Sequence, residues 1–481
     1  MVGFLLQKGL GMATRIAAPD FVMSPAGELR DCPWWRPLDV SVVGQPPPGD
    51  RVIARLLPDL LNAFREQGHI VAEQADGKVH LMLGFAEVPD GPAPLRDRIP
   101  ERETPLALAL VREFGLPRRP ENLVVLMTIS DRLADRPHME VIEAARTAMA
   151  RIGTPKVVFL SGDRETGRLE EATYCTLEGG HPTDREHQVE RIRDRLVTMA
   201  SAVEVGREYE VVRDAFPRDA WERAPIPEAV VEAGRRMDRL GLLPAPKRIF
   251  EYGGARLSRL YERFFNLKGF SEGMLFAVDP ETGTTMVTAS GSWDVDKRAL
   301  RREEVIPVTF EGGKLRILAP EGVKPKGPSV ETWEVMSMLE SVPRVRVRKT
   351  EDGTWTRDEE GDVEVPIVRA GIHAHVGVTR VDEDVVETVP ANRRVFPYGF
   401  GCGTDLMCEV AEDAASRSRA ITDPADPRAY VRWPMLYHGD AVLELWKPGV
   451  PGRPLGGLLD LYDPERMDAI DFTPDHLEQP V

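Results

Sequence analysis

The sequence predicts an α/β protein in two parts: an open, parallel-sheet α/β domain, followed by an α/β/α domain with a mainly antiparallel sheet. Two observations lead to this prediction. Residues 38–205 alternate short, fully apolar runs with amphipathic stretches, which is typical of parallel strands covered by helices on both faces. Beyond residue 245 the pattern changes to alternating, β-branched segments joined by tight turns, which is typical of antiparallel hairpins.

The chain has 481 residues, which is enough for two to three domains. Residues 206–245 contain several prolines and read as connective and helical, so the domain boundary is placed there. We expect an N-terminal extension, a Rossmann-like α/β domain, a second domain and a C-terminal tail. Their predicted limits are 1–37, 38–225, 226–457 and 458–481.

The first domain has four predicted strands and four predicted helices. Apolar side chains recur at helical spacing in the first helix, on the face that includes Leu56, Leu60 and Phe64. The predicted strands are 39–44, 79–84, 123–129 and 156–162, and the predicted helices are 51–67, 104–115, 138–152 and 184–204.

The loop at residues 44–50 (GQPPPGD) follows the first strand and precedes a helix. Phosphates often bind at such a turn, but its three prolines remove three amide donors and the loop has no Walker lysine. The alternative is a stiff turn with Asp50 as the helix N-cap, and the composition favours this alternative.

In the second domain we expect a hairpin of residues 274–278 and 286–289, a helix at 228–242 and a helix at 331–339. The charged segment at 349–368 is predicted to be an inserted hairpin, and residues 367–378 are predicted to form a strand.

The charge and cysteine content limit the partners and the compartment. A net charge of −16 argues against binding to duplex nucleic acid or to an anionic membrane, since both need a basic face. No apolar run approaches the ~18–20 residues needed to cross a bilayer, and the opening segment lacks a clear secretory cleavage site. Four scattered cysteines without a CxxC pair indicate free thiols. We therefore expect a cytoplasmic protein with a small-molecule substrate.

Three histidines and one glutamate form a candidate metal site. His373 and His375 lie two residues apart on a predicted strand, so both point to the same face. His438 follows an apolar strand, and Glu331 opens a helix. Three histidines with one movable carboxylate are a complete catalytic zinc set. The alternative for His373 and His375 is a paired surface or cross-strand role.

Residues 230–445 resemble the class II aldolase/adducin-like family. The resemblance rests on the order of five motifs rather than on any single one. The matching segments are Gly269-Phe270-Ser271 with Ser290-Gly291, Pro328-Ser329-Val330-Glu331, His373 with His375, Tyr398–Ala411, and Tyr437-His438-Gly439.

The resemblance implies a site and a reaction. The metal ligands would be His373, His375 and His438, and Glu331 would be the catalytic carboxylate. The metal would be Zn²⁺, with Fe²⁺ or Mn²⁺ as alternatives for the same ligands. The protein would be a lyase or isomerase that acts on a hydroxy-carbonyl or sugar-phosphate-like substrate through a metal-stabilised enediolate. It would also be a homo-oligomer, by resemblance a tetramer.

Each of four further site residues has two alternative roles. Ser290, Gly291 and Ser329 could bind a phosphate or carboxylate, or they could form a hairpin turn. Tyr398 could donate a proton or be a packed aromatic residue.

Three other functions compete with the lyase or isomerase. One is an Fe(II)-type oxygenase or decarboxylase on the same site, and another is a non-catalytic, adducin-like scaffold. In the third, the N-terminal domain carries the function by binding a nucleotide or sugar.

Overall fold

The computed structural model describes most of the two predicted domains. The described residues are 37–72, 81–87, 99, 105–109, 123–130, 136–154, 156–174, 188–201, 208–243, 248–265, 273–290, 297–312, 314–374, 382–389, 405–434, 440–448, 450 and 452–462. Within them, no helix is long and apolar enough to span a bilayer.

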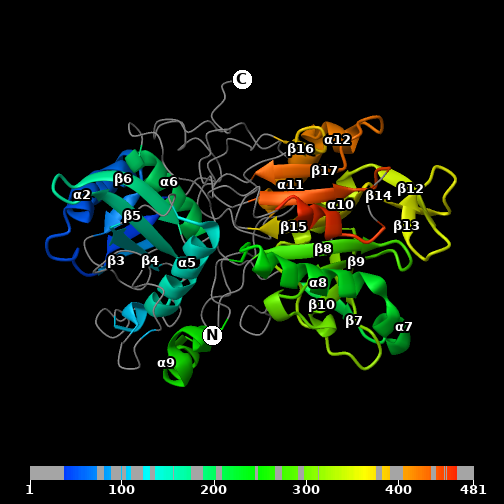
Figure 1. The fold of residues 1–481 in the computed structure, drawn as a ribbon, viewed down its shortest axis with the longest axis horizontal. Coiled ribbons are helices and arrows are strands. Elements are labelled where there is room, and N and C mark those ends of the chain that lie inside the picture. Colours follow the sequence, from blue (N-terminus) through cyan, green and yellow to red (C-terminus); the bar gives the residue numbers. More distant parts are fainter. Residues whose placement is uncertain are drawn as a thin grey trace.

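The first sheet has six strands in the order β2-β1-β3-β4-β5-β6 (Figure 1). The first five strands in this order are parallel, and β6 forms an antiparallel hairpin with β5. The prediction of an open, parallel-sheet domain is therefore confirmed. The strands are β1 (Asp39–Val42), β2 (Ile70–Ala72), β3 (Leu81–Glu87), β4 (Leu123–Ile129), β5 (Val157–Asp163) and β6 (Arg168–Tyr174).

Helices cover both faces of this sheet. All seven residues of β4 are buried, and its alternate side chains enter two separate apolar clusters. Val124 and Leu126 pack with helices α2 (Arg51–Glu66) and α6 (Gln188–Ser201), whereas Val125 packs with α5 (His138–Ile152) on the other face. Burial on both faces explains why these strands read as continuous apolar runs.

Asp50 is the N-cap of α2. The Ile53 amide donates a hydrogen bond of 3.0 Å to the Asp50 carboxylate. Leu56, Leu60 and Phe64 lie on the buried face of the helix, as their spacing predicts. The prediction of Asp50 as the helix N-cap is therefore confirmed.

The second sheet has nine strands in the order β16-β17-β18-β15-β8-β9-β10-β11-β7. Only the two edge pairs, β16 with β17 and β11 with β7, are parallel, so the sheet is mainly antiparallel as predicted. The strands are β7 (Tyr209–Val212), β8 (Met274–Asp279), β9 (Thr284–Thr288), β10 (Val305–Glu311), β11 (Lys314–Leu318), β15 (Val368–Ala374), β16 (Val386–Thr388), β17 (Tyr430–Pro434) and β18 (Asp440–Leu445).

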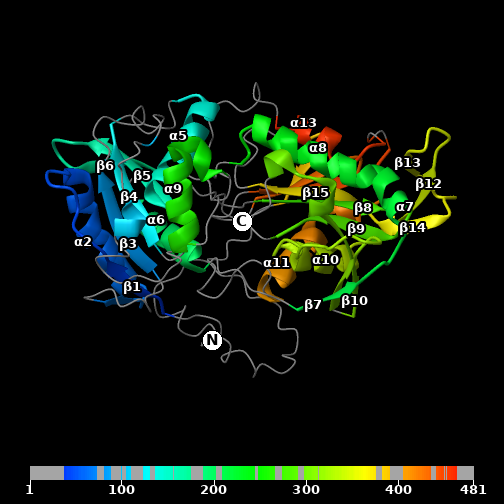
Figure 2. The ribbon, with the colours of Figure 1, turned by 90° about the horizontal axis from the view of Figure 1, so that it is seen from below.

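This sheet lies between two layers of helices, which is the predicted α/β/α arrangement. Figure 2 shows α8 and α13 on one face, and α10 and α11 on the other. The helices of this half are α7 (Arg218–Arg223), α8 (Pro225–Arg239), α10 (Thr332–Ser341), α11 (Asp405–Arg417), α12 (Arg419–Thr422) and α13 (Gly456–Asp460), with short 3-10 turns at Lys297–Ala299 and Arg302–Glu304.

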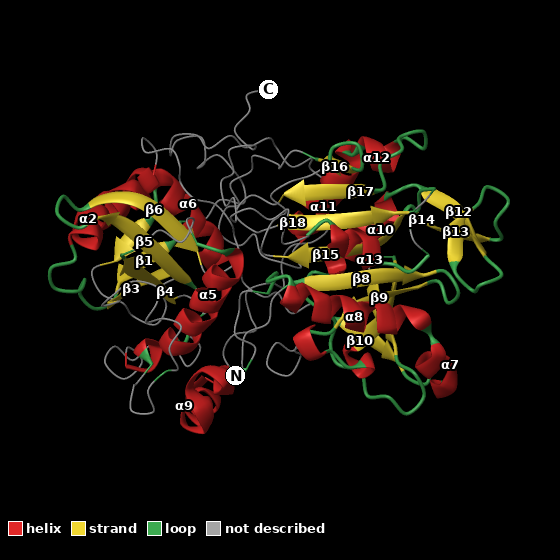
Figure 3. Ribbon diagram, in the orientation of Figure 1, coloured by secondary structure: helices red, strands yellow, loops and turns green. Residues whose placement is uncertain are grey.

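The predicted inserted hairpin is a small sheet of three strands. These are β12 (Arg344–Lys349), β13 (Trp355–Arg357) and β14 (Val363–Pro366), in the order β13-β12-β14. Figure 3 shows this sheet at the outer end of the second sheet, on the side away from the first. The third strand was not predicted, because β12 carries charged residues at alternate positions and reads as a solvated segment.

Helix α9 (Ile249–Phe265) and the end of α8 join the two halves. The Tyr261 hydroxyl donates a hydrogen bond of 2.6 Å to the carbonyl oxygen of Ala150 in α5. The buried Arg146 guanidinium of α5 donates to the Leu243 carbonyl oxygen at 2.7 Å and to Asp238 of α8 at 2.8 Å. These contacts are buried or half-buried, so they hold α5 against the second half with little competition from water.

Candidate active site

A cavity of about 510 Å³, part of it open to solvent, lies between the second sheet and helices α10 and α11. Its floor comes from β8, β15, β17 and β18, and its roof from the two helices. The floor residues are Met274, Phe276, Ile372, His373, Trp433, Ala441 and Leu443.

The strand register arranges the floor in two rows. His373 of β15 pairs with Met274 of β8 on one side and with Ala441 of β18 on the other, and Ala441 pairs with Trp433 of β17. This first row lies where β15 ends and where β8 and β18 begin. His373 is therefore held at the strand-end side of the cavity, and it is 92% buried, with 8% of its surface exposed.

The second row lies two residues away from the first on each strand. Gly371 pairs with Phe276 on one side and Leu443 on the other. A Cβ atom at Gly371 would lie 2.4 Å from the Phe276 ring and 3.0 Å from Leu443. The absence of a side chain at Gly371 therefore lets the Phe276 ring lie over β15 and form part of the cavity floor.

Glu331 stands at the start of α10, above the first row. The segment before it is joined to the end of β9, because the Ser329 amide donates to the Thr288 carbonyl oxygen at 3.0 Å. The Ser329 hydroxyl donates to the Glu331 carboxylate. Glu331 and His373 are 42 positions apart in the sequence, and the fold brings both of them to the same cavity.

Ser290 lies beside this turn and is not among the described residues that line the cavity. Its amide donates to the Gly327 carbonyl oxygen at 2.8 Å. The amides of Ser290 and Ser329 are thus both bonded within the chain, and the Ser329 hydroxyl is bonded to Glu331. Ser329 therefore has a structural role, because its hydroxyl holds the Glu331 carboxylate in place.

The other predicted site residues, His375, His438, Tyr398 and Gly291, lie outside the described residues. Two of them are close in sequence to a described strand pair. Ala374, the last residue of β15, pairs with Asp440, the first residue of β18. His375 follows Ala374 directly, and His438 precedes Asp440 by two positions. Within the described part of the chain, no group of three or more His, Cys, Asp or Glu side chains is arranged to hold a metal ion.

Glu334 also lines the cavity, and the sequence analysis missed it. It lies one helical turn after Glu331 and is buried, with 8% of its surface exposed. The signal was present in the sequence: Glu331, Glu334, Val335 and Met338 recur at a spacing that places them on one face of a helix. An acidic side chain on the apolar face of a helix rarely becomes buried without a partner or a function.

The opposite face of β15 carries a buried ion pair. A β-bulge between Val368 and Ala370 places Arg369 and Ala370 together opposite Glu444. The Arg369 Nε atom lies 2.9 Å from the Glu444 carboxylate, and the guanidinium lies 4.6 Å from the centre of the Trp446 ring. Burial raises the pKa of the Glu444 carboxyl and lowers the pKa of Arg369. The bulge therefore directs Arg369 away from the cavity.

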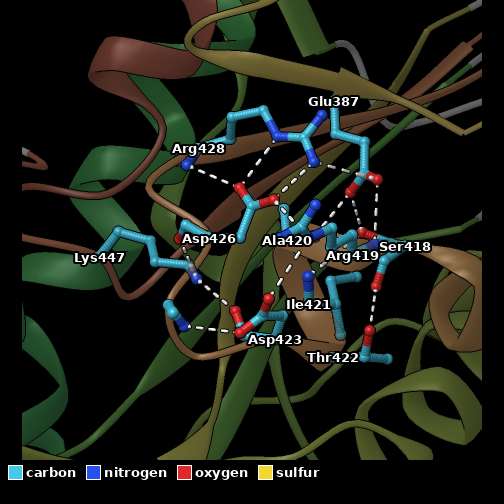
Figure 4. Close-up of polar contacts among 11 residues, drawn as sticks. Glu387, Ser418, Arg419, Ala420, Ile421, Thr422, Asp423, Asp426, Arg428 and Lys447 are labelled. Atoms are coloured by element: carbon cyan, nitrogen blue, oxygen red, sulfur yellow. Dashed lines mark hydrogen bonds and ion pairs between the residues drawn. The ribbon is translucent and has the colours of Figure 1, made fainter.

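A larger polar cluster near α12 has a structural role (Figure 4). Glu387 of β16 accepts hydrogen bonds from the Ser418 hydroxyl at 2.6 Å and from the Arg419 and Ala420 amides at 3.0 and 2.7 Å. The hydrogen bond from Arg428 lowers the pKa of Asp426 to about 2. The Asp423 and Asp426 carboxylates are bonded to nearby residues of the same loop. The Glu387 carboxylate reaches another segment, so it ties the start of α12 to β16.

Comparisons with known proteins add a distant structural likeness. No family model matches the chain, and no curated protein matches it significantly. Among solved structures, the chain is similar to an L-fuculose 1-phosphate aldolase, with a TM-score of 0.28 and 14% identity over 53% of this chain and 89% of that one. A likeness this distant does not by itself assign an activity to this chain.

Proposed function

We propose that the protein is a metal-dependent lyase or isomerase of aldolase type, acting on a hydroxy-carbonyl substrate. The observation that carries this proposal is the convergence of His373 and Glu331 on one cavity. One residue comes from a central strand and the other from the start of a helix, and both were singled out by the sequence motifs. A metal ligand beside a carboxylate in a concave, largely apolar site is an arrangement suited to proton transfer next to a carbonyl group.

The proposal includes a divalent metal held by histidine side chains. His373 would be one ligand, and His375 and His438 are the proposed second and third ligands. Imidazole ligands suit Zn²⁺, and Fe²⁺ or Mn²⁺ are alternatives for the same set. When bound, such an ion would act as a Lewis acid that polarises the substrate carbonyl.

The described residues would move and position the proton. Glu331 would remove a proton from the substrate and return it, as a general base and acid. Ser329 would hold the Glu331 carboxylate through its hydroxyl, and the apolar lining around them would exclude water. Tyr398 remains the proposed proton donor, and Ser290 and Gly291 remain proposed substrate contacts.

Metal analysis and isotope exchange together test this proposal. The purified protein should hold one zinc, iron or manganese ion per chain, and His373→Ala should lose it. Incubated in D₂O, the metal-loaded protein should exchange the α-protons of hydroxyacetone, as followed by proton NMR. Glu331→Gln should keep the metal and slow the exchange by roughly 10²–10⁴-fold, because the general base is gone.

Glu340→Gln is the matched control, since Glu340 is exposed on the same helix and does not line the cavity. It should keep both the metal and the exchange rate. If the reconstituted protein binds no metal, or if Glu331→Gln and Glu340→Gln exchange alike, the proposal is wrong. Oxygen consumption with the iron-loaded protein would instead favour the oxygenase.

A further inference from the structure

The cavity has a polar end and an apolar end. Its first row, with His373, lies at the strand ends, and Glu331 opens α10 above that row. The second row places Phe276 and Leu443 on either side of Gly371. The roof follows the same order, because the segment before Glu331 is bonded to the end of β9 next to the start of β8, and Met338 lies two helical turns further along α10. A bound molecule therefore meets polar groups at the strand ends and apolar groups further in.

The charge of the cavity disfavours an anion. Its described lining contains two carboxylates, Glu331 and Glu334, and includes no lysine or arginine. A phosphate or carboxylate group moved from water into this space would lose its hydration and gain no cation in return from these residues.

The apolar and aromatic surface of the cavity suits a small organic molecule. Phe276 and Trp433 present ring surfaces to the cavity, and Met338 adds a flexible side chain that adapts to the shape of its neighbour.

We propose that the cavity binds an uncharged hydroxy-carbonyl compound that carries an aromatic or branched aliphatic group. The apolar group packs against Phe276, Leu443 and Met338, and the hydroxy-carbonyl end faces His373 and Glu331. The placement of the polar end rests on the proposed function. The apolar character of the ligand rests on the lining alone.

Calorimetric titration of the full-length protein with two probes, after incubation of the protein with zinc, tests the ligand class. The probes are 1-hydroxy-3-phenylpropan-2-one and dihydroxyacetone phosphate, which share the hydroxyketone and differ in the attached group. The phenyl probe should bind at least about tenfold more tightly, with a negative change in heat capacity that reports apolar burial. Tighter binding of the phosphate probe, or no binding of the phenyl probe, overturns the proposal.

A matched pair of variants locates the bound group. Ala411 of α11 lines the cavity, whereas Ala414 on the same helix is equally buried and does not line it. Ala411→Leu should fill the cavity and weaken binding of the phenyl probe at least about tenfold. Ala414→Leu should leave binding unchanged. Equal weakening in both variants overturns the proposed location, and the wild-type titration stands even if either variant fails to fold.

The outcomes separate this proposal from the proposed function. Hydroxyacetone, the exchange substrate, carries neither a phenyl nor a phosphate group. A protein that exchanges hydroxyacetone but prefers the phosphate probe would refute only the ligand class. A protein that binds the phenyl probe but neither holds a metal nor exchanges protons would refute the catalytic function and support the ligand class.

Discussion

The two faces of strand β15 bury polar groups in opposite ways. On one face Arg369 and Glu444 are fully buried and form an ion pair with each other. On the other face His373 is buried almost as deeply, but it lines a cavity together with two glutamates. Burial is thus similar on both faces, and what differs is that the polar groups of the second face line a space that a ligand can enter. That difference is the stronger indication of function.

A second buried histidine, His69, has a structural role. His69, in the first half, is 6% exposed and lies next to Phe64, with ring centres 5.7 Å apart. Its Nδ1 atom accepts a hydrogen bond from the Leu38 amide at 3.0 Å, and its Nε2 atom lies 2.9 Å from the Gln67 side-chain oxygen. Both ring nitrogens are engaged within the chain, so the role of this histidine is structural.

Arg369→Met breaks the buried ion pair and should have the largest effect on stability. It leaves the Glu444 carboxyl buried without its cation, so the free energy of unfolding should fall by about 3–5 kcal/mol. Urea unfolding followed by circular dichroism measures this change. The double variant Arg369→Met/Glu444→Leu should recover most of the loss, because it removes both charges. A fall of less than about 1 kcal/mol in the free energy of unfolding of the single variant would show that the ion pair is accessible to water.

The pH dependence of stability tests the structural role of His69. Burial, with a smaller contribution from Arg193, lowers the pKa of His69 to about 4. Above pH 6.5 the ring is neutral in both the folded and the unfolded chain, and its contribution is fully present. Between pH 6.5 and 4 only the unfolded chain takes up the proton, so the free energy of unfolding should fall by about 3 kcal/mol in total.

Urea unfolding of the wild type and of His69→Gln, at pH 7, 5.5 and 4.5, isolates the contribution of His69 to this pH dependence. The difference between the two proteins should shrink as the pH falls. A difference that stays constant with pH would mean that His69 is accessible to protons in the folded state.

Gly371→Ala should have the smallest effect on stability, and it acts on the cavity face. The added Cβ forces the Phe276 ring to move, at a cost of about 1–3 kcal/mol. Because that ring forms the cavity floor, binding of the phenyl probe should weaken as well. Gly456→Ala is the control, since a Cβ there meets nothing within 4 Å. Unchanged probe binding in a folded Gly371→Ala protein would place the ligand elsewhere.

Local sequence patterns predicted the regular elements that are buried on both sides. The limits of β4 and α5 agree with the predicted ranges 123–129 and 138–152, because continuous apolar runs and helical periodicity depend only on near neighbours. Strands β2, β6 and β7 were not predicted. They are short or polar: all four residues of β7 are exposed or half-buried, and β6 carries charged residues. Pairing with a neighbouring strand, rather than their own pattern, makes them strands.

The sequence by itself determined the fold class, the N-cap at Asp50 and the choice of His373 and Glu331 as candidate site residues. Only the tertiary structure decided that these two residues share a cavity, that Glu334 joins them, and that the bulge turns Arg369 to the other face. The physical reason is the range of the interactions. Periodicity and capping are set by residues a few positions apart, whereas strand register and bulges are set by pairing between segments far apart in the chain.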